Sequence, residues 1–231
     1  MKASEVRKAF YTSIPVMSGY IVLGIGFGIL LRNAGFGVLW AFAMSAAIYA
    51  GSMQYLGISL LSGAAGLLTA AAATLVVNAR HLFYGISMIG RYKDAGRYKP
   101  YLIFALTDET YSLLCGGNVP EGVDPNRYRF FVSLFNHMYW ILGSVLGSLL
   151  GAVIPFSTAG IEFSMTALFI ASLTGQWMKR SNRLPALVGL GSTLLCLILF
   201  GPERFLIPAM LVITLALTLL RGRLRGREAR E

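Results

Sequence analysis

Polar and ionisable residues inside two apolar stretches are the positions in this chain best suited to do chemistry. Asn78, Arg80 and His81 fall in one stretch, and Asp108 and Glu109 fall in a neighbouring one. Each charge at the centre of a lipid bilayer costs about 2.5–3.5 kcal/mol. Residues held at such a cost usually pair with one another or line a polar path, so this pattern indicates transport.

The side chains of these stretches define the available chemistry. The Arg80 guanidinium can hold a carboxylate through two parallel hydrogen bonds, and His81 can exchange a proton near neutral pH. A buried carboxyl group at Asp108 or Glu109 can load and release protons. In the alternative, Arg80 pairs with Asp108 and only holds two helices together, while Glu109 reaches the lipid headgroups. The sequence leaves both interpretations open.

The composition indicates which elements position these residues. Of the 231 residues, 56% are hydrophobic and 13% are charged, whereas soluble domains carry about 25% charged residues. Because a bilayer core of about 30 Å needs about 20 apolar residues per helix, the length allows about seven or eight spans. We therefore predict a single integral membrane domain over residues 1–231. The apolar runs fall at about 13–32, 38–62, 65–90, 101–117, 129–153, 161–178, 184–200 and 203–220.

The polar connector 118–128 divides the chain into two halves that look related. Each half opens with a tyrosine and two glycines at the same spacing: Tyr20, Gly24 and Gly28, then Tyr139, Gly143 and Gly147. This pattern predicts pseudo-repeats over about 13–90 and 129–200, and many transporters place their substrate site where such repeats meet. Close packing of helix backbones in lipid explains the glycines better than ligand contact does.

The distribution of charge bears on topology. Basic residues cluster in the connectors 91–99 and 179–183 and in the tail 221–231, which is typical of cytoplasmic loops. Eight full crossings would place the connector 91–99 outside. The segment 101–117 is short and carries adjacent acids at its middle, so we expect it to be broken or re-entrant. Seven crossings then remain, with the N-terminus outside and the halves as inverted repeats. That arrangement places Lys2, Arg7 and Lys8 outside, so the charges leave open the side of the N-terminus and the choice between inverted and parallel repeats, and we favour seven crossings.

A second interruption is expected near 78–81. Asn78 and His81 share one helical face, while Arg80 and Tyr84 share another, so a straight helix would expose one polar face to lipid. We therefore predict an all-α polytopic membrane protein with seven, alternatively eight, transmembrane segments in two related halves. The helices near 78–81 and 101–117 should be broken or re-entrant, and the C-terminal tail should be cytoplasmic.

Several classes of function find no support in the sequence. It contains no zinc-protease helix motif, nucleophile elbow or phosphate-binding loop, and no cluster with metal-ligand spacing. The net charge of +10 comes without the interleaved aromatics of a nucleic-acid surface. Cys115 and Cys196 lie far apart in apolar surroundings, so we expect neither a disulfide nor a metal site. We predict no cofactor, no metal and no nucleic-acid partner.

Five motifs occur in order along about residues 10–220: Tyr49-Ala-Gly-Ser-Met-Gln-Tyr55, Asn78-Ala-Arg-His81, Leu106-Thr-Asp-Glu109, Asn136-His-Met-Tyr-Trp140 and Glu162-Phe-Ser-Met-Thr-Ala-Leu-Phe169. Together they resemble the AzlC family of azaleucine-resistance proteins, the large subunits of bacterial branched-chain amino-acid exporters. The resemblance implies a protein of the bacterial inner membrane that exports leucine, isoleucine, valine and sometimes methionine. It also implies coupling to the proton motive force and a small AzlD-like membrane subunit as partner.

The resemblance and the side-chain chemistry together suggest roles. Arg80 would meet the substrate carboxylate, and apolar side chains near Tyr49 and Met53 would face the aliphatic side chain. The substrate-binding candidates are Tyr49, Ser52, Met53, Gln54, Asn78 and Arg80. The proton-coupling candidates are His81, Asp108 and Glu109, and the secondary candidates are Asn136, His137 and Glu162. The alternatives are a non-transporting scaffold or assembly subunit, an intramembrane enzyme that uses His81, Asp108 and Glu109, or a passive channel.

Overall fold

The computed structural model describes most of the chain. The described residues are 3–117, 119–153, 160, 163, 166, 170, 173, 174, 177, 178, 180–202 and 205–220. Within them every regular element is a helix, which confirms the all-α prediction. The chain divides into two compact units, residues 1–164 and 165–231, and each is described by itself. The secondary candidate Glu162 lies outside the described residues.

Only some of the apolar runs form long helices. In the first unit these are α1 (Ala3–Asn33) and α8 (Pro125–Val153), and in the second unit α10 (Arg180–Phe200). These three are the helices, among the described residues, that are long and apolar enough to cross a bilayer. The predicted count of seven or eight crossings is therefore not confirmed, and one reason is that other apolar runs are divided into shorter helices.

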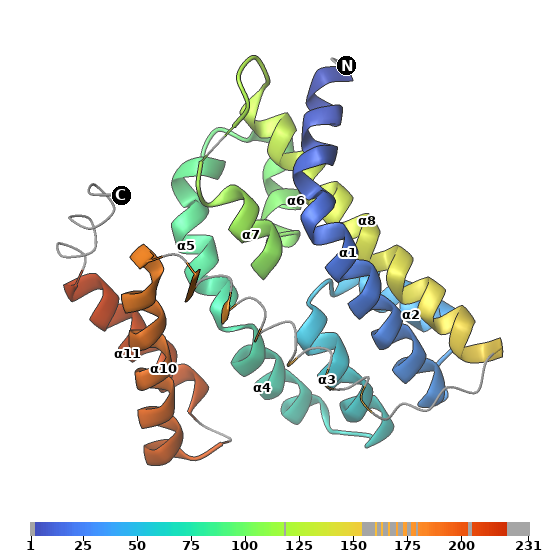
Figure 1. Cartoon of the computed structure of the whole chain (residues 1–231). Helices are drawn as coiled ribbons and strands as arrows, with labels where there is room; N and C mark the ends of the chain where they lie inside the picture. The colour runs from blue at the N-terminus through green and yellow to red at the C-terminus, as the bar shows by residue number, and fades with distance from the viewer. Residues whose placement is uncertain are drawn as a thin grey trace. The chain divides into compact units, whose positions relative to one another are not determined.

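The short helices come in pairs. The run 38–62 forms α2 (Val38–Ala47) and α3 (Gly51–Ser62), and the run 65–90 forms α4 (Leu67–Asn78) and α5 (Arg80–Tyr92). The run 101–117 contains α6 (Lys99–Phe104) and α7 (Asp108–Leu114), preceded by the short 3-10 helix η1 (Gly96–Tyr98). The interruptions predicted near 78–81 and within 101–117 are thus present in the structure (Figure 1).

A third interruption, at Ile48–Ala50, was not expected from the sequence, which treats 38–62 as one run. Tyr49 has φ +46°, in the left-handed region that side chains other than glycine rarely adopt. Gln54 donates a hydrogen bond to the Ser45 hydroxyl at 3.1 Å, which ties α3 back onto α2. A bulky residue in a left-handed conformation gives no local sequence signal, because tertiary contacts impose it.

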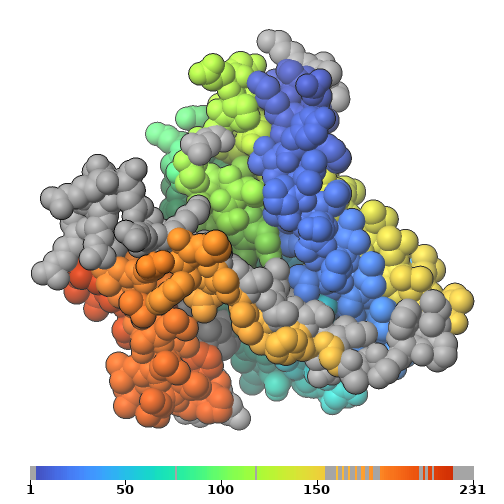
Figure 2. All heavy atoms as spheres, in the orientation of Figure 1, coloured from blue at the N-terminus to red at the C-terminus, as the bar shows by residue number. Residues whose placement is uncertain are grey.

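Helices α1 and α8 pack closely side by side and run in the same direction (Figures 1 and 2). A Cβ added at Gly143 would lie 2.7 Å from the carbonyl oxygen of Ile21, and one added at Gly24 would lie 2.9 Å from the amide nitrogen of Ser144. These glycines are therefore packing positions, as predicted. The proposed repeat itself stays a prediction, but halves opened by α1 and α8 would be parallel rather than inverted.

One end of the first unit gathers three segments, residues 5–12, 91–98 and 119–129, and is called the charged end here. Lys8 donates to the carbonyl of Glu121 at 2.7 Å, and Asn126 donates to the carbonyl of Asp94 at 2.9 Å. Arg127 also forms an ion pair with Glu5 at 3.2 Å. The seven-crossing arrangement places the N-terminus opposite the connector 91–99, whereas the structure places both at the same end.

This arrangement makes two pairs of short helices into hairpins (Figure 1). The second hairpin, α6–α7, starts and finishes at the charged end, with its turn at Ala105–Thr107. The first hairpin, α2–α3, starts and finishes at the opposite end, where α1 finishes, with its turn at Ile48–Ala50. The two turns meet, since the rings of Tyr49 and Phe104 lie 6.2 Å apart.

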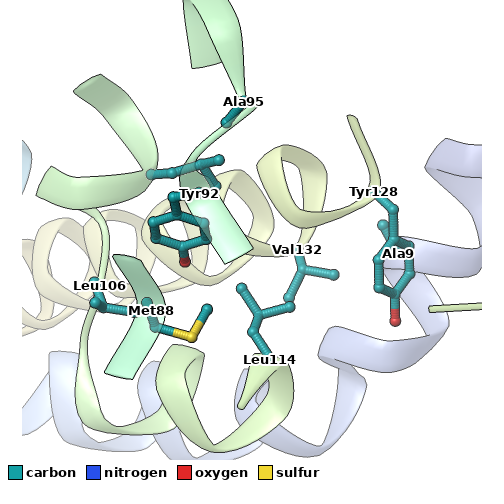
Figure 3. Close-up of a cluster of buried hydrophobic side chains, with 9 residues drawn as sticks. Ala9, Met88, Tyr92, Ala95, Leu106, Leu114, Tyr128 and Val132 are labelled. Atoms are coloured by element: carbon teal, nitrogen blue, oxygen red, sulfur yellow. The ribbon is translucent and has the colours of Figure 1, made fainter. Parts of the chain in front are cut away.

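An apolar cluster fixes the second hairpin in place (Figure 3). Its buried side chains come from α1, α5, α6, α7 and α8 and from their connectors: Ala9, Met88, Tyr92, Ala95, Leu102, Leu106, Leu114, Tyr128 and Val132. Burial of each large apolar side chain contributes about 1.5–3 kcal/mol where it is removed from water. In the second unit, α10 packs against α11 (Leu206–Leu219).

Candidate functional site

Two of the three helix interruptions meet about halfway along α1, at Tyr20. The Tyr20 hydroxyl lies 2.6 Å from the hydroxyl of Thr107 in the second hairpin. The ring of Tyr20 meets that of Tyr49 in the first hairpin edge to face, with 6.4 Å between centroids. Irregular backbone at this depth needs protein partners, because lipid offers none. The candidate site is therefore built from hairpin turns held by long helices.

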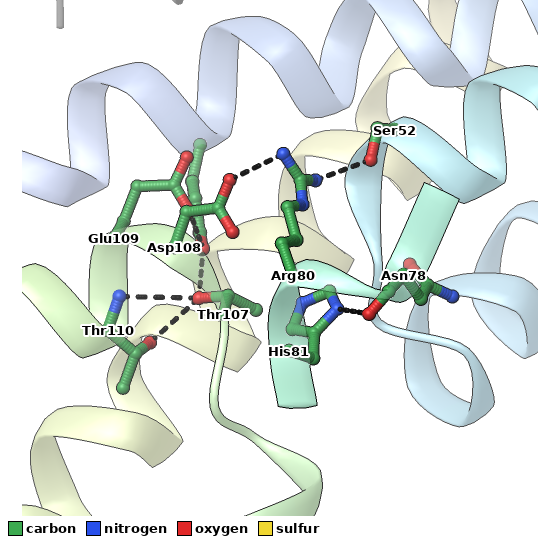
Figure 4. A network of polar contacts seen from close by, with 9 residues as sticks. Ser52, Asn78, Arg80, His81, Thr107, Asp108, Glu109 and Thr110 are labelled. Carbon is green, nitrogen blue, oxygen red and sulfur yellow. Dashed lines mark hydrogen bonds and ion pairs between the residues drawn. The ribbon is translucent and has the colours of Figure 1, made fainter. Parts of the chain in front are cut away.

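An ion pair lies beside these turns (Figure 4). The Arg80 guanidinium places Nη1 2.8 Å from Oδ2 of Asp108 and donates from Nη2 to the Ser52 hydroxyl at 2.6 Å. It thus joins α5 to the first turn of α7 and the first turn of α3. The two charged side chains are about a quarter exposed, at 24% and 26%. This contact matches the alternative in which Arg80 ties helices together.

A chain of hydroxyl groups starts at the second acid. The Tyr20 hydroxyl donates to Oε2 of Glu109 at 2.7 Å. On the other side of Tyr20, Thr107 donates to the Thr110 hydroxyl at 3.0 Å, and Asn136 donates to the same hydroxyl at 3.1 Å. Thr107 also caps α7 by accepting a hydrogen bond from the Thr110 amide at 3.3 Å. The two adjacent acids therefore lie in different surroundings.

A cavity of about 540 Å³ opens next to this network, within the usual 300–1,000 Å³ of small-molecule sites. It lies where the first hairpin's turn, the end of α4, α5 and α6 come together. Its walls are mostly aliphatic and aromatic. The lining residues are Ile48, Tyr49, Ala50, Asn78, His81, Leu82, Gly85, Ile89, Tyr92, Lys99, Ile103, Phe104 and Leu106.

Two predicted polar residues supply hydrogen-bonding groups to this cavity. His81 places Nδ1 3.2 Å from the backbone carbonyl of Asn78, so a neutral ring donates from Nδ1 and keeps Nε2 as an acceptor. The side-chain oxygen of Asn78 is buried and has no hydrogen-bond partner among the described residues. A buried acceptor of this kind is costly to leave without a donor.

The remaining candidates lie within helix interfaces. Gln54 is fully buried, and its side-chain oxygen accepts a 2.8 Å hydrogen bond from the indole of Trp140. His137 contacts both hairpins, because Nε2 lies 3.1 Å from the Ser45 carbonyl and Nδ1 lies 3.0 Å from the Tyr101 hydroxyl. These two side chains, like the buried Met53 and Asn136, are not part of the cavity lining.

The eleven predicted residues that the structure describes therefore separate into groups. Tyr49, Asn78 and His81 line the cavity, while Ser52, Arg80, Asp108 and Glu109 belong to the polar network beside it. Tyr20, Thr107 and Thr110 were missed as site residues. A threonine followed by two acids is a helix-start signal, and could have identified Thr107 as a cap. Lys99, also missed, had been assigned only to a basic cluster.

These observations define a class, the helical membrane proteins in which interrupted helices lie beside a cavity. The sequence model of a protein family, described as "AzlC protein", matches residues 15–154. The chain belongs to the AzlC family.

The similar proteins extend over most of the chain. The "Branched-chain amino acid transport protein AzlC" of Bacillus subtilis (strain 168) is 46% identical over 96% of this chain and 87% of its own. An "Uncharacterized membrane protein" of Haemophilus influenzae is 41% identical over 94% of this chain and 89% of its own. The "Inner membrane protein YgaZ" of Escherichia coli (strain K12) is 26% identical over 74% of this chain and 72% of its own. No solved structure matches the chain.

Proposed function

We propose that this protein is a secondary transporter that exports branched-chain amino acids across the bacterial inner membrane. The observation that carries the proposal is the aliphatic cavity of about 540 Å³ at the helix interruptions. Leu82, Ile89 and Ile103 form walls that suit a branched aliphatic side chain. The transport name of the Bacillus subtilis relative supports the substrate class.

The polar groups at the inner part of the cavity suit the rest of an amino acid. The Asn78 side-chain oxygen would accept from the substrate ammonium once it is uncovered, and His81 would meet the carboxylate only as an imidazolium, with a proton on Nε2 as well. Arg80 contacts Asp108 and Ser52, which supports a structural role for it. Arg80 would meet the substrate carboxylate only after Asp108 releases it.

The direction of transport has support from charge. Lys8, Arg91 and Arg129 lie at the charged end, and cationic loops face the cytoplasm. The cavity reaches from Asn78 toward Tyr92 and Lys99, which adjoin the connector at that end. An opening there would accept substrate from the cytoplasm, as an exporter requires. The N-terminus and the basic tail 221–231 would then both be cytoplasmic.

The energy source and the partner belong to the same proposal and follow from the family resemblance. One proton moving through 100 mV releases about 2.3 kcal/mol, enough for a roughly fifty-fold gradient of substrate. Glu109 is the better candidate to carry this proton, because Arg80 already compensates Asp108. The transporter would act with a small AzlD-like membrane subunit.

The test is efflux of preloaded labelled leucine from cells that contain both subunits. Gly85 lines the cavity and Gly90 does not, yet both lie on α5 with open space around an added Cβ. We expect Gly85→Leu to abolish efflux and Gly90→Leu to retain it. Normal efflux by Gly85→Leu would contradict the assignment of the cavity. A complex that assembles but never exports leucine would favour the scaffold alternative.

A further inference from the structure

The Tyr20 hydroxyl is placed between a carboxyl group and the start of a helix. It lies 2.7 Å from Oε2 of Glu109 and 2.6 Å from the hydroxyl of Thr107, the cap of α7. Its ring packs against Trp140 of α8 at 5.5 Å, so the long helices α1 and α8 hold it. Tyr20 therefore connects a rigid helix pair to the turn of the second hairpin.

The hydroxyl groups of Tyr20, Thr107 and Thr110 have too few protons to fill all of the contacts described here when Glu109 is ionised. Each hydroxyl has one proton to donate. When Thr107 donates to Thr110, as its geometry favours, Tyr20 faces two acceptors, Glu109 and Thr107, with a single proton. One group must therefore change its donor direction, or Glu109 must supply a proton.

The two protonation states of Glu109 resolve this count differently. With an ionised carboxylate, Tyr20 donates its proton to Glu109. Thr107 must then donate to Tyr20 rather than to Thr110, because otherwise no proton lies in the 2.6 Å contact between the Tyr20 and Thr107 hydroxyls. With a protonated carboxyl group, Glu109 donates to Tyr20, Tyr20 to Thr107 and Thr107 to Thr110. Binding of one proton thus reverses the hydrogen bonds between Glu109 and the cap of α7.

We infer that Tyr20 is a positioning residue that transmits the protonation state of Glu109 to the turn of the second hairpin, and so couples proton binding to substrate movement. The inference rests on the proposed function. Leu106 of this turn and Phe104, the last residue of α6 before it, line the cavity, so a shift of the cap reaches the substrate site. Among the residues that the structure describes, the titratable or charged groups that interact with Glu109 are Tyr20, Tyr49, Arg80, Tyr84 and Asp108.

The chain offers a matched control. Tyr139 also makes a buried hydroxyl contact between α1 and α8, 3.0 Å from Ser13, but it has no described contact with Glu109. Tyr20→Phe and Tyr139→Phe each remove one hydroxyl and keep the ring. A purely structural role for Tyr20 predicts the same result for both variants, whereas a coupling role predicts different results.

The experiment uses the complex of both subunits in proteoliposomes. Leucine counterflow without a gradient measures substrate movement, and its acceleration by an imposed pH gradient measures coupling. We expect Tyr20→Phe to keep counterflow within about twofold and to lose about tenfold or more of the acceleration, the factor expected for one hydrogen bond to a charged group. Glu109→Gln should lose the acceleration to a similar extent, and Tyr20→Phe combined with Glu109→Gln should lose no more of it than either single variant. Tyr139→Phe should retain both counterflow and its acceleration.

Two outcomes would overturn the inference: a normal response of Tyr20→Phe to the gradient, or an equal loss of response in Tyr139→Phe. A second measurement does not require transport. Infrared difference spectra of the purified complex should show a carboxyl band that titrates with pH and is absent in Glu109→Gln. The midpoint should move in Tyr20→Phe but not in Tyr139→Phe, and an unmoved midpoint contradicts the inference. Absent leucine counterflow in the wild type, with a normal band shift, would instead contradict the proposed function alone.

Discussion

The guanidinium of Arg80 and the carboxylate of Asp108, 2.8 Å apart, join two interrupted helices at the points where each resumes. Arg80 is the first residue of α5 and Asp108 the first residue of α7. A carboxylate at a helix start is also favoured by the helix dipole. The pair therefore stabilises two helix starts. The same guanidinium also binds the first turn of α3, because it donates a hydrogen bond to the Ser52 hydroxyl.

This pair should show strong energetic coupling. Arg80→Gln or Asp108→Asn alone removes this ion-pair contact from the remaining charge, which costs about 3–5 kcal/mol when fully buried and less here, about 1–3 kcal/mol, because the pair is partly exposed. The double variant should be more stable than either single variant. Thermal unfolding of the purified protein in detergent measures this. Losses that simply add in the double variant would contradict the coupling.

The same double variant separates two roles for Arg80. If Arg80 is structural, Arg80→Gln with Asp108→Asn should export leucine at a rate near that of the wild type, since both charges are removed together. The measurement is labelled leucine efflux at equal expression of both subunits. Complete loss of efflux by a well-folded double variant would show that Arg80 itself meets the substrate.

Close contact between α1 and α8 should make the glycine positions intolerant of side chains. In Gly143→Ala the new methyl group would lie 2.7 Å from the Ile21 carbonyl oxygen, and such overpacking costs about 1–3 kcal/mol. Gly19→Ala is the control, because nothing lies within 4 Å of its added Cβ. We expect a lower unfolding temperature for Gly143→Ala than for Gly19→Ala. Equal temperatures would contradict the packing.

Much of this architecture could be predicted from composition and spacing. The acids in the middle of a short apolar run indicated the interruption at 105–107, and polar residues on two faces indicated the one near 79. The interruption at Tyr49 could not be predicted, because its left-handed conformation has no local sequence signal and its ring contacts with Tyr20 and His137 are visible only in the fold. The sequence interpretation therefore counts 38–62 as one crossing rather than a hairpin, and this places the N-terminus on the opposite side from the connector 91–99.

The site was predicted in part for a related physical reason. Charged and amide side chains are conspicuous in an apolar chain, so Arg80, Asp108 and Glu109 were found. The cavity walls were not, because Ile89 or Ile103 is indistinguishable in sequence from any residue that faces lipid. Only the fold brings them together with Asn78 and His81.

The turn after α3 offers a stabilising substitution. Ala64 has φ +47° there, a conformation that costs about 1–2 kcal/mol for any residue with a side chain and that glycine adopts readily. Ala64→Gly should therefore raise the unfolding temperature in detergent. Ala65→Gly serves as the comparison and should not raise it, because Ala65 has no positive φ. A lower temperature for Ala64→Gly would contradict the assigned backbone conformation.

The two opposed hairpins predict which residues share a side of the membrane. Lys93 and Glu121 belong to the charged end, whereas Asn33 and Ser62 finish α1 and α3 at the other end. Single cysteines at these positions, with Cys115 and Cys196 replaced by serine, can be labelled in spheroplasts with a membrane-impermeant maleimide. Asn33→Cys and Ser62→Cys should react at once, and Lys93→Cys and Glu121→Cys only after permeabilisation. Labelling of Asn33→Cys and Ser62→Cys from opposite sides would contradict the first hairpin.

Occupation of the cavity by leucine is the central claim, and protection of an introduced cysteine tests it most directly. The experiment uses the purified complex without native cysteines. The rate of alkylation of Gly85→Cys by a small maleimide is measured in the absence and in the presence of leucine, and Gly90→Cys on the same helix is measured as the control. Leucine should slow alkylation at position 85 and leave position 90 unchanged, and alanine should protect less than leucine. Equal alkylation of Gly85→Cys with and without leucine would contradict the claim.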